Sequence, residues 1–116
     1  MSPKETDIQK EIMTMLLNIG IVAWRNPGQA RRVAGGVRVK NATTGIPDIL
    51  GVCRNGRFLG IEVKTQKGRI EDHQEAFHTW ISSAGGLVFV ARSVEDVISR
   101  LPEIVATQPC PVPSNS

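Results

Sequence analysis

One stretch of this chain, residues 45–64, constrains the fold more than any other: GIPDILGVCRNGRFLGIEVK. Two apolar runs with the composition of β-strands are separated by an Asn-Gly dipeptide, a pattern typical of a β-hairpin. Three charged residues, Asp48, Glu62 and Lys64, nevertheless lie within these runs. Burying such groups is costly unless they pair with one another or bind a metal ion. The segment therefore predicts a hairpin that carries a charged site.

The length of the turn decides whether these charges meet, because a slip of one residue reverses the faces of a strand. A two-residue loop would pair Asp48 with Val63 and turn the aspartate away from Glu62. A three-residue loop, residues 54–56, sets Asp48 directly opposite Glu62 and places Gly56 in the left-handed region, which glycine adopts without strain. We predict the three-residue loop, with a positive φ at Gly56.

Length and composition indicate a single soluble domain. The chain has 116 residues, 41% of them hydrophobic and 22% charged, and its net charge of +3 permits a nucleic-acid partner. Two cysteines, Cys53 and Cys110, form no disulfide framework and suit a reducing compartment. The sequence has no leader-like start and no apolar run near the ~18 residues of a membrane span, so we expect a cytoplasmic protein with no membrane partner. We expect one domain at 1–107 and a flexible proline-rich tail at 108–116.

Hydrophobic periodicity and turn residues predict a small α/β domain with a mixed β-sheet flanked by helices. The expected elements besides the hairpin are helices over 3–19, 71–83 and 94–101, strands over 21–25 and 87–91, and a long loop over 28–45 with a weak ribbon at 37–39. Ser2 is the expected N-cap of the first helix, and Pro102 is expected to end the last one. The nearly all-apolar run 87–91 is typical of an interior strand.

The charged residues of the hairpin point to phosphodiester chemistry. Glu62 and Lys64 lie two apart in a strand and so share a face, and Asp48 can be brought beside them. Two converging carboxylates suit Mg²⁺ or Mn²⁺, and an adjacent lysine can orient a water or stabilise charge on a phosphate. The plainer alternative is an exposed cross-strand ion pair between Glu62 and Lys64. No motif for an organic cofactor is present.

A cluster of basic residues lies between the first strand and the hairpin. These candidate DNA-binding residues are Arg25, Arg31, Arg32, Arg38 and Lys40. They would neutralise phosphates and draw a polyanion toward the carboxylates, which alone would repel it. The alternative is a solvated flap without a partner.

We predict structural roles for the two tryptophans and the two histidines. We expect Trp24 and Trp80 in the core rather than as platforms for bases. His73 and His78 point about 140° apart on their predicted helix, so we expect surface or packing roles rather than a shared metal site.

Several motifs in one order resemble a known family. The Pro-Asp of TGIPDILG, the hairpin and then the E-V-K of IEVKTQKGRIEDHQEAF resemble the PD-(D/E)xK nuclease superfamily. Together with DIQKEIMTMLLNIG, AWRNPG and GGLVFVARSVEDV, they resemble its VRR-NUC branch, the virus-type replication-repair nucleases, over residues 5–101. The resemblance implies a restriction-endonuclease-like core of the kind found in Holliday junction resolvases.

The resemblance also implies roles for individual residues. Asp48 and Glu62 would be metal ligands, assisted by the Val63 carbonyl, and Lys64 would be the catalytic lysine. Gln74 would face the site from the helix that follows, although a surface position for it is the plainer alternative.

The superfamily further places an acidic residue on the first helix, where Glu5 and Glu11 are the candidates. At about 100° per residue, the apolar stripe of this helix is centred within about 60° of Glu5, whereas Glu11 lies about 120° away. We therefore predict Glu5 as the site residue and Glu11 as a solvated charge. Alternatively, Glu5 completes a capping box with Ser2.

These features together predict a Mg²⁺- or Mn²⁺-dependent DNA endonuclease. The family resemblance implies a homodimer that cuts branched double-stranded DNA, particularly four-way (Holliday) junctions, and the size suits a phage or mobile element. One alternative is a flap- or duplex-specific nuclease of the same superfamily. Another is a non-catalytic DNA-binding module that keeps the fold.

Overall fold

A computed structural model describes residues 3–27, 30–32, 38–40 and 45–109. The helices are α1 (Glu5–Asn18), α2 (Asp72–Ser83), α3 (Val94–Ile98) and α4 (Leu101–Ile104), and the strands are β1 (Val22–Arg25), β2 (Ala30–Arg32), β3 (Arg38–Lys40), β4 (Ile49–Val52), β5 (Phe58–Val63) and β6 (Leu87–Ala91). The expectations for Ser2 as a cap, for Cys110 and for a flexible tail over 110–116 lie outside the described residues. Within the described part of the expected tail, the Gln108 carbonyl accepts a hydrogen bond from Asn55 Nδ2 at 2.9 Å.

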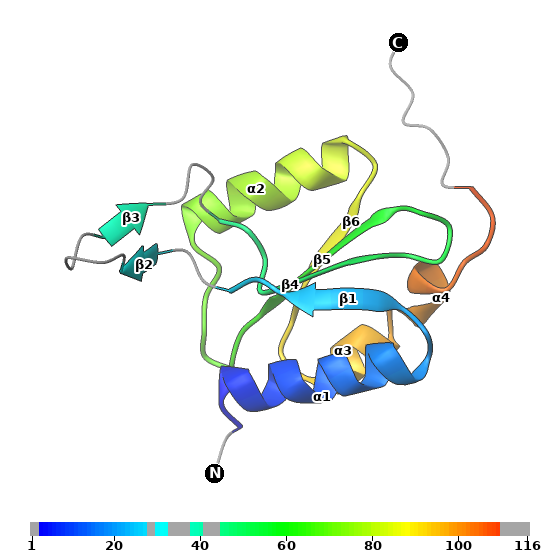
Figure 1. Ribbon diagram of the computed structural model, residues 1–116, viewed down its shortest axis with the longest axis horizontal. Helices are drawn as coiled ribbons and strands as arrows, with labels where there is room; N and C mark the ends of the chain where they lie inside the picture. The colour runs from blue at the N-terminus through cyan, green and yellow to red at the C-terminus, as the bar shows by residue number, and fades with distance from the viewer. Residues whose placement is uncertain (1–2, 28–29, 33–37, 41–44, 110–116) are drawn as a thin grey trace.

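The main sheet has four strands in the order β1-β4-β5-β6. Its first three strands are antiparallel and β6 runs parallel to β5, so the sheet is mixed. Helix α2 lies on one face, whereas α1 and α3 lie on the other (Figure 1). Strands β2 and β3 form a separate antiparallel ribbon that projects at the end of the body where α1 and α2 begin (Figure 1). This arrangement confirms the predicted helix-flanked mixed sheet.

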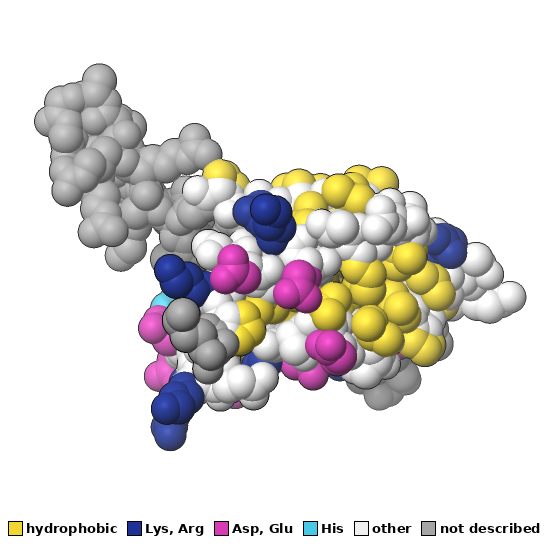
Figure 2. Space-filling view, turned by 90° about the horizontal axis from the view of Figure 1, so that it is seen from below, with side chains coloured by type: hydrophobic (Ala, Val, Ile, Leu, Met, Phe, Trp, Pro, Cys, Tyr) yellow, Lys and Arg dark blue, Asp and Glu magenta, His cyan; other side chains and the backbone are white. Residues whose placement is uncertain are grey.

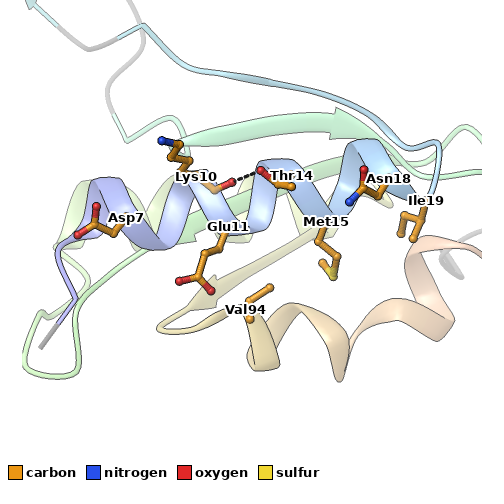
Figure 3. Close-up of a pocket in the computed structure, with 8 residues that line it drawn as sticks. All are labelled: Asp7, Lys10, Glu11, Thr14, Met15, Asn18, Ile19 and Val94. Atoms are coloured by element: carbon orange, nitrogen blue, oxygen red, sulfur yellow. Dashed lines mark hydrogen bonds between the residues drawn. The ribbon is translucent and has the colours of Figure 1, made fainter.

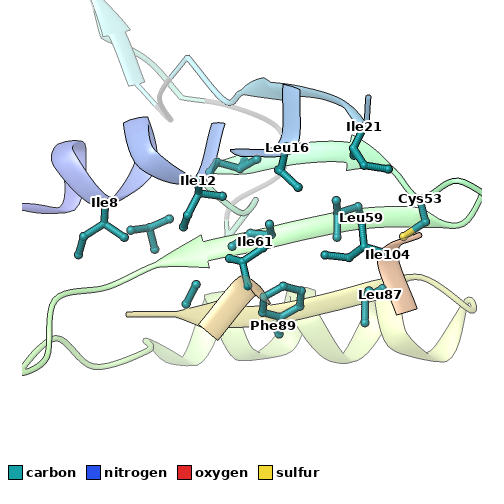
Figure 4. Packing of buried hydrophobic residues seen from close by; sticks show 14 residues of the cluster. Ile8, Ile12, Leu16, Ile21, Cys53, Leu59, Ile61, Leu87, Phe89 and Ile104 are labelled. Atoms are coloured by element: carbon teal, nitrogen blue, oxygen red, sulfur yellow. The ribbon is translucent and has the colours of Figure 1, made fainter. Parts of the chain in front are cut away.

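The core lies between α1 and the sheet. Ile8, Ile12 and Leu16 recur every four residues on α1, and all three are buried. They face Leu59 and Ile61 of β5, which are also fully buried (Figure 4). Removing each such side chain from water contributes about 1.5–3 kcal/mol, so this stripe anchors α1 beneath the strand that carries Glu62.

The hairpin has the predicted three-residue loop. The Cys53 N–H donates to the Arg57 carbonyl at 2.8 Å, and Gly56 has a φ of +90°. The ladder of β4 and β5 continues this register to its last pair, Ile49 with Ile61. One further residue along each strand, Asp48 lies opposite Glu62. The register prediction is therefore confirmed.

Helix α1 begins later than predicted. Its first residue is Glu5 and its N-cap is Lys4, so Pro3 precedes the helix rather than opening it. Asp7, three residues after the cap, accepts the Lys4 N–H on Oδ2 at 3.4 Å. The reciprocal contact expected of Glu5 is thus made by Asp7, because the acid must lie three residues after the cap to reach back to it.

Strand β6 is an edge strand and not the predicted interior strand. Among the described strands it pairs with β5 alone, although its apolar composition was expected to reflect strands on both sides. Leu87 and Phe89 are buried toward α1 and α3, while Val88 is half-buried on the opposite face. Helices cover both faces of β6, and this cover accounts for the apolar run without a second neighbouring strand.

The predicted helix over 94–101 is divided into α3 and α4. Ser93 caps α3 as expected, with Oγ accepting the Asp96 N–H at 3.3 Å. Pro102 lies in the first turn of α4 and does not end a helix. Proline cannot continue a preceding helix because it lacks the N–H, but it fits a first turn.

Both tryptophans are exposed, which overturns their predicted place in the core. The exposed fraction is 46% for Trp24 and 73% for Trp80. Trp24 lies on β1, the edge strand farthest from β6, and α2 packs against β6. On the face of the sheet where α2 packs, the half nearer to β1 is therefore not covered by any described helix.

Among the described residues, none of the helices combines the length and apolar character needed to cross a bilayer.

The ribbon is longer than the predicted one at 37–39. It pairs Ala30–Arg32 with Arg38–Lys40, and Arg32 lies opposite Arg38. The pairing partner at 30–32 was not anticipated, because it consists of an alanine and two arginines without the alternating apolar pattern that marks a strand.

Candidate active site

Asp48 is fixed by the strand opposite it. Its Oδ2 accepts the backbone N–H of Val63 at 2.8 Å, and its own carbonyl accepts the Asn26 N–H at 2.8 Å. Because the ladder between β4 and β5 ends before Val63, the Asp48 carboxylate takes the place of a backbone acceptor. In an antiparallel pair the N–H and C=O of one residue point to the same side, so the Val63 carbonyl is directed to this edge as well.

Glu62 is the most deeply buried charged group in the site, with an exposed fraction of only 3%. Its Oε2 accepts a hydrogen bond from Gln74 Nε2 at 3.1 Å. Its Oε1 is buried and has no hydrogen-bond partner among the described residues. A buried oxygen of this kind costs free energy unless a cation or a proton meets it.

The start of α2 orients Gln74. Glu71 is the N-cap, and its backbone N–H donates to Gln74 Oε1 at 2.9 Å. With its oxygen engaged in this way, the amide presents its nitrogen to Glu62. The capping contact of α2 and the contact with the buried carboxylate thus use opposite ends of one side chain.

Lys64 completes the cluster. Its Nζ lies 4.0 Å from Glu62 Oε2, and its side chain is 13% exposed. Its backbone N–H donates to the Ala91 carbonyl at 3.0 Å, which continues the pairing of β5 with β6 past the end of the strand. The lysine is therefore held on the sheet next to the two carboxylates.

Arg92 fixes the turn that follows Lys64, and sequence reasoning missed it. Its Nη1 donates to the carbonyls of Thr65 and Gly68, each at 2.6 Å. A single arginine after a strand carries no signal of such a role, since the turn that it binds lies more than 20 residues away in the chain.

Burial and neighbouring charge raise the pKa of Glu62 to about 8. The largest cause is desolvation, followed by a hydrogen bond with the Asp48 carboxyl and repulsion by its charge; Lys64 acts in the opposite direction. Glu5 adds a smaller repulsive contribution. A cation bound between the two carboxylates would offset both the desolvation of Glu62 and its repulsion by Asp48.

The raised pKa makes the stability of the metal-free protein depend on pH. Between about pH 4.5 and 8 the folded protein holds a proton on Glu62 that the unfolded chain has released, so this stabilisation is complete below that range and is lost as the pH rises through about 8. In EDTA, we expect the Tm of the wild type to fall relative to that of Glu62→Gln as the pH is raised from about 5 to about 9.

Thermal unfolding followed by circular dichroism at each pH measures this difference. Glu11→Gln is the matched control, because Glu11 is exposed and does not contribute to the shift at Glu62. Parallel Tm curves for the wild type and Glu62→Gln across the range would contradict the raised pKa.

The two acidic candidates of α1 lie in different surroundings. Glu5 is exposed at the first position of the helix, yet it is among the charges that act on Glu62. Glu11 lines a groove of about 620 Å³ between α1 and α3, beside Met15 and Val94 (Figure 3). The face of the molecule that carries α1 gathers hydrophobic side chains toward the C-terminal end of this helix (Figure 2). The groove is lined by residues of α1, Ile19 and Val94 and by neither member of the acid pair.

The donor set is small but suits a hard cation. Among the described residues, no three His, Cys, Asp or Glu side chains form a group able to hold a metal, so Glu5 does not close a cage with Asp48 and Glu62. Mg²⁺ commonly takes one or two carboxylates and fills the remaining positions with water. The Glu62 Oε1, which has no partner among the described residues, and the raised pKa of this carboxyl group fit such an ion. His73 is exposed and pairs with Glu71 at 3.5 Å, so it adds no ligand here.

The positions of the basic candidates lie near the end of the molecule that carries the acid pair. Arg25 is exposed at the end of β1, which leads directly into the ribbon. The backbone of the ribbon carries positions Arg31 and Arg32 on β2 and Arg38 and Lys40 on β3. The starts of α1 and α2 lie at this end too (Figure 1).

Comparison with protein families now decides the identity of the fold. The family model of the VRR-NUC domain matches residues 8–95, which include the acid pair, the lysine and Gln74. The chain belongs to the VRR-NUC family. It is accordingly a nuclease of the PD-(D/E)xK type, and DNA is its substrate class.

Solved VRR-NUC structures share the fold. One described as a VRR-NUC domain is 22% identical, with a TM-score of 0.62 over 84% of this chain and 92% of the other. A second, described as a VRR-NUC domain protein, is 17% identical, with a TM-score of 0.64 over 99% of this chain and 98% of the other. No curated protein matches the chain.

Proposed function

We propose that this VRR-NUC protein is a Mg²⁺- or Mn²⁺-dependent endonuclease that cuts four-way DNA junctions as a homodimer in the cytoplasm. The observation that carries the catalytic part is the buried acid pair, in which Glu62 Oε1 has no partner among the described residues and Lys64 lies 4.0 Å from Oε2. A pure DNA-binding module would gain nothing from carboxylates that face phosphate.

In the proposed site, Asp48, Glu62 and the Val63 carbonyl hold the cation. When bound, it supplies charge neutralisation and lowers the pKa of a coordinated water. Gln74 keeps Glu62 in its orientation through the 3.1 Å hydrogen bond. Lys64, anchored beside the pair, stabilises negative charge on the phosphate or accepts a proton from the attacking water.

The dimer follows from the geometry of the proposed substrate. Resolving a junction requires two symmetric nicks, whereas the described part of one chain contains a single acid pair; a two-fold dimer supplies the second. Val22, Val52 and Phe58, which lie side by side across three strands, are 64%, 39% and 37% exposed. An uncharged row of this kind supports a protein contact on that part of the sheet.

A panel of substrates tests the proposal. A four-way junction, a flap and a linear duplex of the same sequence are incubated with the protein in Mg²⁺, in Mn²⁺ and in EDTA. We expect metal-dependent paired nicks in the junction and little cleavage of the other two. Preference for the flap or the duplex would establish the alternative nuclease, and binding without cleavage would establish the DNA-binding module. Sedimentation velocity measures the dimer directly.

The ribbon should control the electrostatic part of DNA binding. Replacing Arg31, Arg32, Arg38 and Lys40 by Ala is expected to weaken binding and to flatten its salt dependence by about 0.9 for each phosphate that is no longer neutralised. Fluorescence anisotropy at several salt concentrations in EDTA gives the slope. Arg69→Ala, a change at an exposed position outside the ribbon, is the control. An unchanged slope in the ribbon variant would show that the ribbon does not contact DNA.

Glu5→Gln should impair cleavage more than Glu11→Gln, because only Glu5 acts electrostatically on the acid pair. As an exposed group outside the set of direct ligands, Glu5 should contribute about tenfold to kcat rather than the larger factor of a ligand. Single-turnover cleavage at a temperature where both variants are folded distinguishes them. Equal rates for the two variants would show that Glu5 only adds a negative charge to the first turn of α1 and does not contribute to cleavage.

A further inference from the structure

The face of the sheet that carries the acid pair is organised in three rows. The register of the strands aligns Val22, Val52 and Phe58 in one row, Trp24, Leu50 and Gly60 in the next, and Asp48 and Glu62 in the third. Neighbouring rows are two residues apart along each strand, which is about 6.8 Å. Trp24 therefore stands one row from the acids and on the same face.

Beyond Trp24, the middle row consists of Leu50 and Gly60. Gly60 contributes no side chain, and Pro47 lies directly above it, where a Cβ on the glycine would meet Pro47 Cγ at 3.0 Å. Leu50, between the two, is half-buried. The indole of Trp24 is 46% exposed on the edge strand β1.

We propose that Trp24 stacks against an unpaired base next to the phosphate held at the acid pair, and that this contact favours branched over fully paired DNA. The inference rests on the proposed nuclease function and deepens it. In a continuous duplex both faces of every base are covered by neighbours, whereas bases at a branch point can unstack and offer a face. Stacking on an aromatic side chain tolerates every base, so it selects structure rather than sequence.

The position of Trp24 separates it from the other exposed apolar residues. Val22, Val52 and Phe58 form the row farther from the acids, and a protein contact can use that row without reaching the site. After Trp24, β1 runs past the acid row, where the Asn26 N–H donates to the Asp48 carbonyl, and the chain then continues to the ribbon. A DNA strand that extends from the ribbon across Asp48 would therefore reach the indole next. Trp80, by contrast, lies on α2 and outside these rows.

The composition of the chain allows a direct spectroscopic test. It contains two tryptophans and no tyrosine, so Trp80→Phe leaves Trp24 as the sole strong emitter. This variant is titrated in EDTA with a labelled four-way junction and with a linear duplex. Anisotropy of the label reports binding, while tryptophan emission reports stacking. Trp24→Phe, which retains Trp80, is the matched control.

We expect the junction to quench Trp24 emission with the same midpoint as the change in anisotropy of the label. At equal occupancy, the duplex should quench this emission little. The emission of the Trp24→Phe control should respond to neither DNA. Emission that stays constant while anisotropy shows junction binding would overturn the proposal. So would emission that changes with protein concentration alone, because that outcome places Trp24 between two copies of the chain. Absence of any DNA binding would instead count against the proposed function.

Binding affinity provides the second measurement. Trp24→Ala should weaken junction binding by roughly 5- to 100-fold, equivalent to ~1–3 kcal/mol at ~1.4 kcal/mol per tenfold, and should leave duplex binding nearly unchanged. Trp24→Phe should retain most of the affinity, because it keeps an aromatic face. Equal losses for junction and duplex, or equal losses for the Ala and Phe variants, would refute a stacking role.

Discussion

Glu62→Gln should reduce the rate of junction cleavage by about 10³-fold or more, because it removes a charged oxygen donor from the proposed metal site. Binding of the junction should be unchanged or tighter, since the variant repels phosphate less. The fold should persist, because the side chain keeps its size and the variant lacks the carboxyl group whose pKa burial raises to about 8. Asp48→Asn should behave alike, because its amide oxygen can still accept the Val63 N–H.

Single-turnover cleavage in Mg²⁺ or Mn²⁺, combined with anisotropy in EDTA, separates catalysis from binding. The matched control is Glu11→Gln, an equal loss of charge at an exposed position in the groove between α1 and α3. A wild-type rate in either Glu62→Gln or Asp48→Asn would eliminate the acid pair as the catalytic site.

Lys64→Ala should lower kcat by roughly 10²-fold, the scale expected for loss of a charge stabiliser or a proton-transfer group. Affinity for Mn²⁺ should change little, because the lysine is not a ligand. The variant should also raise the pKa of Glu62 further, since the positive charge of Lys64 now lowers it. The pH–rate profile should therefore move to higher pH.

The control for this experiment is Lys67→Ala, because Lys67 is exposed in the turn that follows and lies outside the acid pair. Isothermal titration with Mn²⁺ and single-turnover rates across pH provide the readouts. A loss confined to DNA affinity, with an unchanged rate at saturating protein, would show that Lys64 only clamps the substrate.

Several features of the site could be predicted because they depend on neighbouring residues in the chain. The three-residue loop ending at Gly56 sets the register of the hairpin, and that register alone brings Asp48 opposite Glu62. The side-chain period of two then puts Lys64 on the same face. The apolar stripe of α1 likewise follows from spacing, and it is buried as expected.

Other features could not be read from the sequence, because they depend on which surface covers which. The apolar run of β6 is compatible with an interior strand or with an edge strand between helices. Only the strand order places it at the edge, where α2 and α3 cover its two faces. The same packing leaves Trp24 exposed, since α2 covers the β6 half of the sheet and not the β1 half.

By itself, then, the sequence determined the local geometry of the hairpin: turn chemistry and strand periodicity act within about twenty residues and leave a single register that gathers the three charges. Only the tertiary structure decided what surrounds them. Gln74 reaches Glu62 from α2, and Arg92 ties the turn after Lys64 across 24 residues to Gly68. Burial of Glu62 to 3% exposure, which is the main cause of its raised pKa, requires the sheet and the helices together. Desolvation is a property of the assembled layers, and no local pattern of residues encodes it.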